Sequence, residues 1–312
     1  MTRILGFDFG GTKLAVGLYN VEQGLLVARR QQATPHGGAS ASIAAMIDMA
    51  RGLLASQSNQ GLGGVGVSFG GPVAADARTV RLSMHVPGWE HQPLADILEK
   101  EFGVPARVAN DGNAAALAEY RIGAGRGVQH RVYVTVSTGI GGGMVIDGRL
   151  HSGEHAWAGE IGHILLDPDG PPCPCGRNGC LEALASGLSI AREARRVLLE
   201  NPDQPSSLRS VAPENVDARL VAEAARHGDT LAATVWGTAM LWLGRGLANV
   251  ANIVNPGKIV VGGGLTRSGD QLFEPVRAEA GRRTLDPDLE IVPAALGDDV
   301  GILGGCALWL AA

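Results

Sequence analysis

Apolar residues along this chain follow two spacings in alternation. Short apolar runs that end at glycine predict buried strands, and apolar residues three or four positions apart predict helices. In the first half the predicted strands are 4–9, 14–19, 24–34, 62–69 and 104–109, and the predicted helices are 39–57, 94–102 and 112–120. Strands alternating with helices predict an α/β fold with largely parallel sheets flanked by helices.

The same order begins again after residue 130. The second half has predicted strands at 131–137, 144–147, 258–261 and 289–293, helices at 230–253, 271–283 and 300–310, further helices after Cys180, and a polar surface loop at 201–215. Each half opens with strand, glycine turn and strand, which suggests two facing domains with a cleft that suits a small molecule. We expect a small domain of residues 1–118 plus the closing helix 299–312, and a large domain of residues 119–298.

Composition and charge then exclude several classes of protein. The chain has 312 residues, 45% of them hydrophobic, and a formal net charge of −5 without a basic run, which disfavours nucleic acid as a partner. No apolar stretch reaches the length of a membrane span, and the N-terminus enters a strand pattern at once. We therefore expect no signal peptide, no membrane partner and a cytoplasmic location.

Residues 159–182 contain three of the four cysteines. Cys173, Cys175 and Cys180 fall within eight residues, and His163 lies ten residues upstream. Three thiolates and an imidazole form the ligand set of a closed tetrahedral zinc site. The clustering favours a metal in a reducing compartment over disulfides. The sequence therefore predicts a structural zinc ion on these four residues; the alternative is a reduced thiol cluster in an irregular loop.

The glycine turn of the first half indicates phosphate binding. Adjacent glycines such as Gly10 and Gly11 let the main chain approach an anion and point its N–H groups at it. Thr12 and Lys13 add donors, and Asp8 could hold Mg²⁺ through water. Taken alone, this motif is equally well explained as an ordinary β-hairpin.

The second half supplies two further glycine segments. Thr138 and Gly139 open the turn 139–143, which occupies the place equivalent to the first one. Two such hairpins could hold a polyphosphate from both sides. A third glycine loop follows a predicted strand, as a platform for a nucleotide base would, and consists of Gly262, Gly263 and Gly264.

Four polar residues are candidates for acid–base chemistry or for binding hydroxyl groups. Asn110 and Asp111 lie where a predicted strand ends and a helix begins, a position that favours a functional site. A helix N-cap is the other interpretation of a carboxylate there. Glu160 and Glu182 bracket the cysteine-rich segment and are not needed for the zinc shell, so we expect that segment to support a polar pocket.

Six motifs spread over the chain resemble those of ROK family sugar kinases (repressors, uncharacterised reading frames and kinases). They are DFGGTK at 8–13, NDGNAAALAE at 110–119, STGIGGG at 137–143, GEIGH at 159–163, CPCGRNGCLE at 173–182 and NPGKIVVGGGL at 255–265. The resemblance implies an actin-like, ribonuclease H-like fold of two α/β domains with a cleft between, commonly a homodimer. It also implies phosphorylation of a hexose by ATP and Mg²⁺, and we expect glucose modified at its 6-hydroxyl.

Family roles carry over to the matching positions. The resemblance implies that Asp111 takes the proton from the 6-hydroxyl of the sugar. It implies that the sugar is held by Gly71, Asn110, Glu160, His163 and Glu182, with His163 also on the zinc ion. Family kinases often have Asn before the apolar-Pro-Gly-Trp element, where this chain has His85. His85 joins the candidate substrate-binding residues in place of that Asn.

Other functions fit parts of the pattern. An N-acetylmannosamine or N-acetylglucosamine kinase would use the same motifs, and a polyphosphate-dependent kinase is a further enzymatic alternative. A sugar-sensing repressor of the same family would carry a DNA-binding domain before the first hairpin, where only seven residues precede Asp8. A zinc-stabilised binding module would need neither Asp111 nor two phosphate hairpins.

Overall fold

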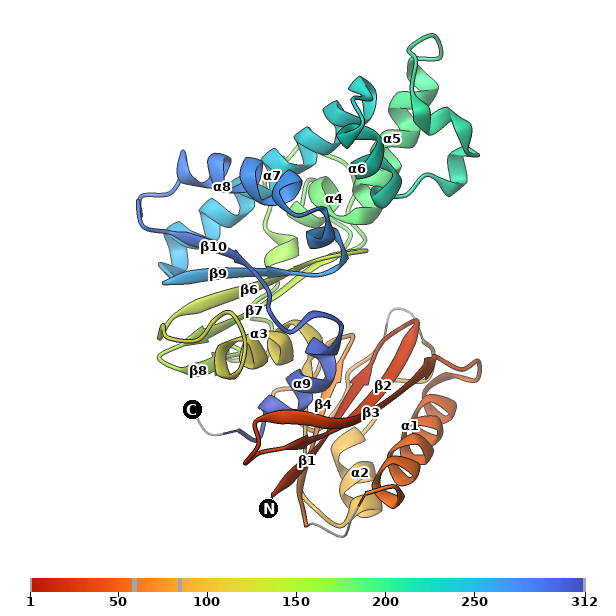
Figure 1. The fold of residues 1–312 in the computed structure, drawn as a ribbon, viewed down its shortest axis with the longest axis vertical. Coiled ribbons are helices and arrows are strands. Elements are labelled where there is room, and N and C mark those ends of the chain that lie inside the picture. The colour runs from red at the N-terminus through yellow and green to blue at the C-terminus, as the bar shows by residue number, and fades with distance from the viewer. Residues whose placement is uncertain (1, 58–60, 84–85, 311–312) are drawn as a thin grey trace. The chain divides into compact units, whose positions relative to one another are not determined.

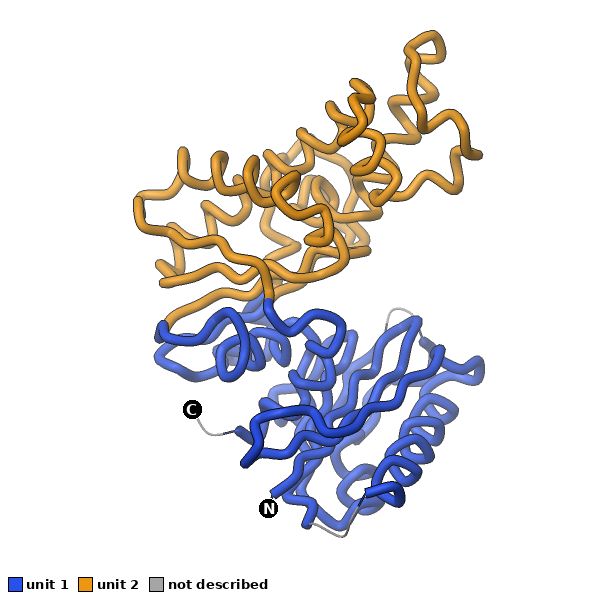
Figure 2. Tube along the Cα trace, in the orientation of Figure 1, with its two compact units in different colours: residues 1–129, 143–159, 295–312 blue, residues 130–142, 160–294 orange. Residues whose placement is uncertain are grey.

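The computed structural model describes residues 2–57, 61–83 and 86–310. Contacts divide the chain into two compact units, which Figure 2 shows in two colours. Unit 1 comprises residues 1–129, 143–159 and 295–312, and unit 2 comprises residues 130–142 and 160–294. The expected domain boundaries after residue 118 and before residue 299 stay a prediction.

Unit 1 is built on a mixed five-stranded sheet with the order β3-β2-β1-β4-β5 (Figure 1). β1 pairs antiparallel with β2 and parallel with β4, which in turn pairs parallel with β5. The elements are β1 (Arg3–Phe9), β2 (Lys13–Asn20), β3 (Leu25–Ala33), α1 (Gly38–Ala55), β4 (Leu62–Phe69), α2 (Leu94–Phe102), β5 (Ala106–Asn110), α3 (Asp111–Arg121), β8 (Arg149–His151), η5 (Gly297–Asp299) and α9 (Val300–Ala307).

Helices cover both faces of this sheet because side chains alternate along each strand. Leu5 and Phe7 of β1 belong to the core that α1 and α2 close, whereas Ile4 packs with Ile302 and Cys306 of α9. Glycine replaces a side chain where α9 comes close to the sheet. A Cβ at Gly6 would overlap the carbonyl oxygen of Ile302 and would lie 2.5 Å from Sγ of Cys306. The backbone of α9 therefore rests almost directly on β1.

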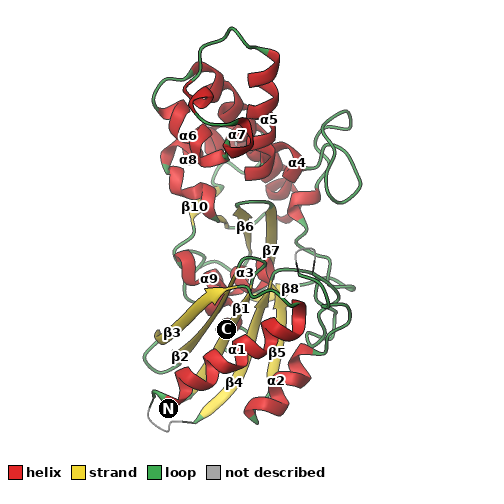
Figure 3. Ribbon diagram, turned by 90° about the vertical axis from the view of Figure 1, so that its right-hand side faces the viewer, coloured by secondary structure: helices red, strands yellow, loops and turns green. Residues whose placement is uncertain are grey.

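The second sheet has the order β10-β9-β6-β7-β8, with β6, β9 and β10 mutually parallel. In unit 2, the 25-residue helix α7 packs against α4, α5, α6 and α8 (Figure 3). The remaining elements are β6 (Arg131–Val136), β7 (Ile140–Ile146), η1 (Ile161–His163), α4 (Leu181–Ala185), α5 (Gly187–Glu200), η2 (Ser207–Ser210), η3 (Pro213–Asn215), α6 (Ala218–Arg226), α7 (Thr230–Val254), β9 (Lys258–Gly262), η4 (Gly264–Ser268), α8 (Asp270–Gly281) and β10 (Glu290–Pro293).

The predicted strands and helices are confirmed, with one difference in the second half. The prediction of a glycine turn over 139–143 was wrong in extent, because β7 begins at Ile140 and includes the last three of these glycines. Packing gives the reason at Gly143. A Cβ there would lie 2.6 Å from the carbonyl oxygen of Gly112 and 2.8 Å from Cβ of Ala116 in α3. The glycine lets the strand contact the helix, and the turn is shorter than expected. Among the described helices, none has both the length and the apolar character needed to cross a membrane.

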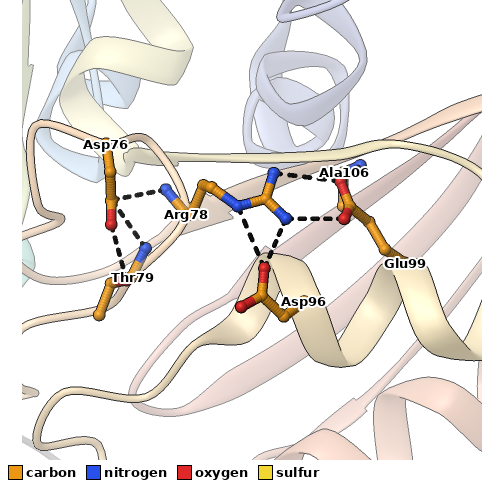
Figure 4. A network of polar contacts seen from close by, with 6 residues as sticks. All are labelled: Asp76, Arg78, Thr79, Asp96, Glu99 and Ala106. Atoms are coloured by element: carbon orange, nitrogen blue, oxygen red, sulfur yellow. Dashed lines mark hydrogen bonds and ion pairs between the residues drawn. The ribbon is translucent and has the colours of Figure 1, made fainter.

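An arginine-centred network fixes the connection that leaves β4 (Figure 4). Nη2 of Arg78 lies 2.5 Å from Asp96 and 2.6 Å from Glu99, both on α2. The other oxygen of Glu99 accepts the backbone N–H of Ala106 in β5 at 2.9 Å. The hydrogen bonds from Arg78 lower the pKa of Glu99. The network therefore ties the segment after Gly71 to α2 and β5.

A buried carboxylate holds the start of the closing segment of unit 1. Glu119 of α3 is 1% exposed. Its Oε1 accepts the backbone N–H groups of Ala295 and Leu296 at 2.9 and 3.0 Å, and its Oε2 accepts that of Ala124 at 2.6 Å. The first two bonds join α3 to the chain that leads into α9, and the third holds the segment that follows α3.

Removing this acceptor should destabilise the protein strongly. Glu119→Ala leaves three backbone N–H groups without their carboxylate, and we expect the free energy of unfolding to fall by roughly 2–4 kcal/mol, since bonds to charged groups are the strong ones. Glu101→Ala, which removes a surface ion pair with Arg51 in the same unit, should cost less than about 1 kcal/mol. Urea unfolding of both variants measures the difference, and equal losses would contradict the account.

Candidate functional site

At the junction of β5 and α3 in unit 1, the N-cap and the exposed carboxylate belong to two neighbouring residues. Asn110 is the N-cap of α3, and its Oδ1 accepts the N–H groups of Gly112 and Asn113 at 3.0 and 3.4 Å. Its Nδ2 donates to the carbonyl oxygen of Gly71 at 3.2 Å. Asp111 is the first helical residue and is exposed. Oδ1 of Asp111 also accepts the N–H of Gly112, at 2.8 Å. Asn110 is nevertheless the N-cap, and Asp111 presents its carboxylate at the helix N-terminus, where the helix dipole favours negative charge.

Asp8 lies near the end of β1 in the same unit. Burial raises its pKa to about 6; the charge of Lys13 opposes this shift, and the negative charge of Asp111 adds to it. The packing of α9 contributes to the burial, because a Cβ at Gly301 would lie 2.5 Å from both carboxylate oxygens of Asp8. Two carboxylates thus influence each other where β1 and β5 end. An oxygen donor set of this kind suits a hard cation such as Mg²⁺.

The first hairpin joins β1 to β2 and has an exposed tip. The N–H of Gly10 donates to the carbonyl oxygen of Lys13 at 3.0 Å, while Gly11 and Thr12 are exposed. Thr34, at the end of β3, supports the hairpin from the side: its hydroxyl donates to Gly10 and its N–H to Thr12, at 2.9 and 3.0 Å. The turn is therefore rigid at its base and open at its tip.

In unit 2, the four predicted metal ligands come together in a group that we call the four-ligand cluster: His163, Cys173, Cys175 and Cys180. Their ligand atoms all lie within 4.8 Å of one another. Nδ1 of His163 is 3.6 Å from Sγ of Cys173, and the sulfurs of Cys175 and Cys180 are also 3.6 Å apart. Tetrahedral Zn–S bonds of about 2.3 Å place sulfur atoms roughly 3.8 Å apart. The residues present therefore fit a four-coordinate zinc ion.

Polar groups lie on the other side of the His163 ring. Its Nε2 is 4.0 Å from Oε2 of Glu160. Partial burial raises the pKa of Glu160, the charge of His163 opposes this shift, and the negative charge of Glu182 adds to it. One imidazole thus has a nitrogen at the four-ligand cluster and a nitrogen beside a pair of interacting carboxylates.

The second hairpin, residues 137–140, joins β6 to β7. The N–H of Ser137 donates to the carbonyl oxygen of Gly139 at 2.9 Å, which closes the turn. Thr138 is exposed at the tip. The N–H of Ile140 donates to Oε2 of Glu182 at 2.8 Å. This last contact joins the hairpin to Glu182, a candidate sugar-binding residue, and was not predicted from the sequence.

The third glycine segment has a packing explanation in unit 2. A Cβ at Gly262 would lie 2.5 Å from the hydroxyl of Tyr133, and one at Gly263 would lie 2.8 Å from Oγ1 of Thr135. Gly263 also has a φ of +93°, which favours glycine. Gly264 begins η4. The first two glycines are needed for contact with β6, whatever the segment binds.

Not every candidate can be placed. His85 lies outside the described residues. The remaining candidates form two separate groups, described within their own units: Asp8, the first hairpin, Gly71, Asn110 and Asp111 in unit 1, and the second hairpin, Gly262 to Gly264, Glu160, Glu182 and the four-ligand cluster in unit 2.

Known proteins resemble this chain over nearly its whole length. A glucokinase of Streptomyces coelicolor is 32% identical, covering 97% of this chain and 96% of that one. An N-acetylmannosamine kinase of Yersinia pestis is 34% identical over 99% and 98% of the two chains. The crystal structure of a ROK family glucokinase from Streptomyces griseus, in complex with glucose and AMPPNP, has a TM-score of 0.83 and 33% identity, covering 98% of each chain.

These likenesses confirm the expected fold class, an α/β fold of the actin-like, ribonuclease H-like type. The sequence profile of the ROK family matches residues 4–312. The chain therefore belongs to the ROK family.

Proposed function

We propose that this protein is an ATP-dependent hexose kinase that phosphorylates the 6-hydroxyl of glucose. The observation that carries the proposal is the exposed carboxylate of Asp111 at the start of α3, in a chain similar over 98% of its length to a glucokinase solved with glucose and AMPPNP. Phosphoryl transfer depends mainly on alignment and on neutralising charge. The candidate residues include hydrogen-bond donors and carboxylates that can align the substrates. They also include carboxylates that can hold a charge-neutralising cation.

Asp111 is the proposed general base. Its carboxylate would accept the proton of the 6-hydroxyl as the oxygen attacks the terminal phosphorus of ATP. Because Asn110 takes the capping role, Asp111 does not have to serve as the N-cap. General-base catalysis typically contributes about 10²–10⁴-fold to the rate.

The sugar hydroxyls are assigned to the residues that the family resemblance implies. Nε2 of His163 is directed toward Glu160 rather than toward the thiols, which supports a role in hydroxyl binding for both residues and for the neighbouring Glu182. Asn110 donates one amide N–H to Gly71 and has a second N–H to offer. We keep the assignment of Gly71, Asn110, Glu160, His163 and Glu182 to the sugar as a proposal.

The hairpin tips and Asp8 are assigned to the nucleotide. Backbone N–H groups at Gly11 and Gly139, with Thr12, Lys13 and Thr138, would contact the phosphates, and the segment from Gly262 to Gly264 would lie near the base. Asp8 would hold Mg²⁺, which neutralises phosphate charge when bound. The negative charge of Asp111 near Asp8 supports this assignment, since a cation would relieve the repulsion between the two carboxylates.

The four-ligand cluster is the proposed site of a structural zinc ion. Four protein ligands leave no coordination position for an activated water, so we assign the metal no chemical step. Its role is to fix the tautomer and orientation of the His163 ring, whose Nε2–H could then donate to a sugar hydroxyl. The distances within the cluster support this assignment.

N-acetylmannosamine kinase is the second candidate, favoured by a relative of that name that is 34% identical over nearly the full chain. In either case the partners are a small hexose and ATP, with no nucleic acid and no membrane. We further propose a cytoplasmic homodimer, on the strength of the family resemblance and the need for ATP.

Asp111→Asn tests the general base. We expect dissociation constants for glucose and for a non-hydrolysable nucleotide to change little, and kcat to fall by ~10²-fold or more, because an amide cannot accept the proton. Asp48→Asn, at an exposed position of α1, is the matched control and should leave kcat unchanged. A near-normal kcat for Asp111→Asn would remove Asp111 from the mechanism.

Substrate preference separates the two candidate functions. We expect kcat/KM for glucose to exceed that for N-acetylmannosamine and N-acetylglucosamine, since no residue of the sequence marks an acetamido pocket. A coupled assay of ADP release measures all three sugars under one set of conditions. A preference of about tenfold for N-acetylmannosamine, equivalent to about 1.4 kcal/mol, would instead establish the second candidate, and the same preference for N-acetylglucosamine would contradict both.

A further inference from the structure

We propose that Glu182 is a positioning residue for the second hairpin, so that it governs nucleotide affinity in addition to the contact with sugar assigned above. The inference rests on the proposed function for the identity of the ligands. The contacts that carry it lie wholly within unit 2.

The carboxylate of Glu182 occupies the inner side of the hairpin. Its Oε2 accepts the N–H of Ile140 at 2.8 Å. A Cβ at Gly139 would lie 2.5 Å from that same oxygen and 3.3 Å from Cδ. A side chain at 139 would therefore displace the carboxylate of Glu182 from its place against the hairpin. The position of Glu182 thus determines where the backbone at 139 and 140 can lie.

Glu182 is itself held by its own helix and the next. It lies in α4, which begins directly after Cys180 of the four-ligand cluster. Its carbonyl oxygen accepts the hydroxyl of Ser189 at 2.6 Å and the N–H of Ser186 at 3.2 Å. The residue is half-buried. Its side chain therefore starts from a fixed backbone, as a positioning residue must.

Residues at the junction of α4 and α5 form hydrogen bonds with the rest of the hairpin. The N–H of Gly187 donates to the carbonyl oxygen of Ser137 at 2.8 Å, and that of Leu188 donates to Thr138 at 3.2 Å. A Cβ at Gly162 would overlap the carbonyl oxygen of Ile140, so the chain just before His163 packs on the hairpin as well. The segments on either side of the cysteines thus both contact the turn.

These contacts have a consequence for the nucleotide. Backbone N–H groups bind phosphate well only when the turn holds them in place beforehand. The Glu182–Ile140 bond orients the peptide group between Gly139 and Ile140. This peptide group lies next to the backbone N–H of Gly139, which is proposed to contact the phosphates. Losing the bond would loosen that peptide and weaken nucleotide binding even when no sugar is present. A residue that served only the sugar would not have this effect.

The experiment measures AMPPNP affinity by titration calorimetry without sugar, in Mg²⁺. Glu182→Ala should weaken binding by ~10-fold or more, the range expected for a lost bond to a charged acceptor. Glu182→Gln keeps an oxygen that can accept from Ile140 and should bind AMPPNP nearly as the wild type does. Glu160→Ala removes the other carboxylate of the same polar group, which is paired with His163 and not with the hairpin. This variant should lower the affinity for glucose and leave that for AMPPNP unchanged.

Amide hydrogen exchange gives a second readout at the turn. The Ile140 N–H should exchange faster in Glu182→Ala than in the wild type or in Glu182→Gln. If Glu182→Ala does not fold, Glu182→Asp, one methylene shorter, withdraws the carboxylate and should show the same selective loss of nucleotide affinity. Equal metal content in all variants checks that the four-ligand cluster is intact.

Unchanged AMPPNP affinity in folded Glu182→Ala, or equal losses in the Ala and Gln variants, would overturn the inference and leave the kinase assignment untouched. A wild-type chain that phosphorylates none of the hexoses named above would instead contradict the proposed function. The two failures are therefore read from different measurements.

Discussion

The arrangement of polar groups in unit 2 depends on the four-ligand cluster. Between β8 and α4 the chain forms one short helical turn, Ile161–His163, and two isolated β-bridges, and its two buried cysteines pack with Ala183 of α4. A segment with so little regular structure needs another constraint to hold its side chains in place. The zinc ion proposed above would supply that constraint through His163 and the three thiolates, because metal binding to such a set is also folding free energy. It would hold His163, Glu160 and α4 in position around it.

Unit 1 positions its polar groups by a different means. Asp8 and Asn110 lie at the carboxyl ends of β1 and β5, and Gly71 follows β4, so three strands bring their ends to one edge of the sheet. Parallel sheets commonly present ligand-binding groups there. Two polar networks hold the frame: the buried carboxylate of Glu119 holds the chain leading to α9, and the more exposed Arg78 holds the segment after Gly71. Regular secondary structure does in unit 1 what the four-ligand cluster does in unit 2.

Sequence periodicity was sufficient to predict most of the fold, because apolar spacing records which face of each element is buried. The grouping of the four side chains in the cluster was also predictable, since Cys173, Cys175 and Cys180 are close in sequence. The bond from Ile140 to Glu182 was not, because it joins residues 42 positions apart and leaves no periodic signal. Gly143 was assigned to a turn for a related reason: glycine marks both tight turns and close helix contacts, and only the neighbouring α3 distinguishes them.

The most direct test of the central claim is X-ray absorption at the zinc edge, with metal analysis, on protein purified without chelator. The account predicts one zinc ion per chain, with three sulfur ligands at about 2.3 Å and one nitrogen ligand at about 2.0 Å. Protein that contains no zinc, or zinc with a water or carboxylate oxygen in place of one of these four ligands, would contradict it.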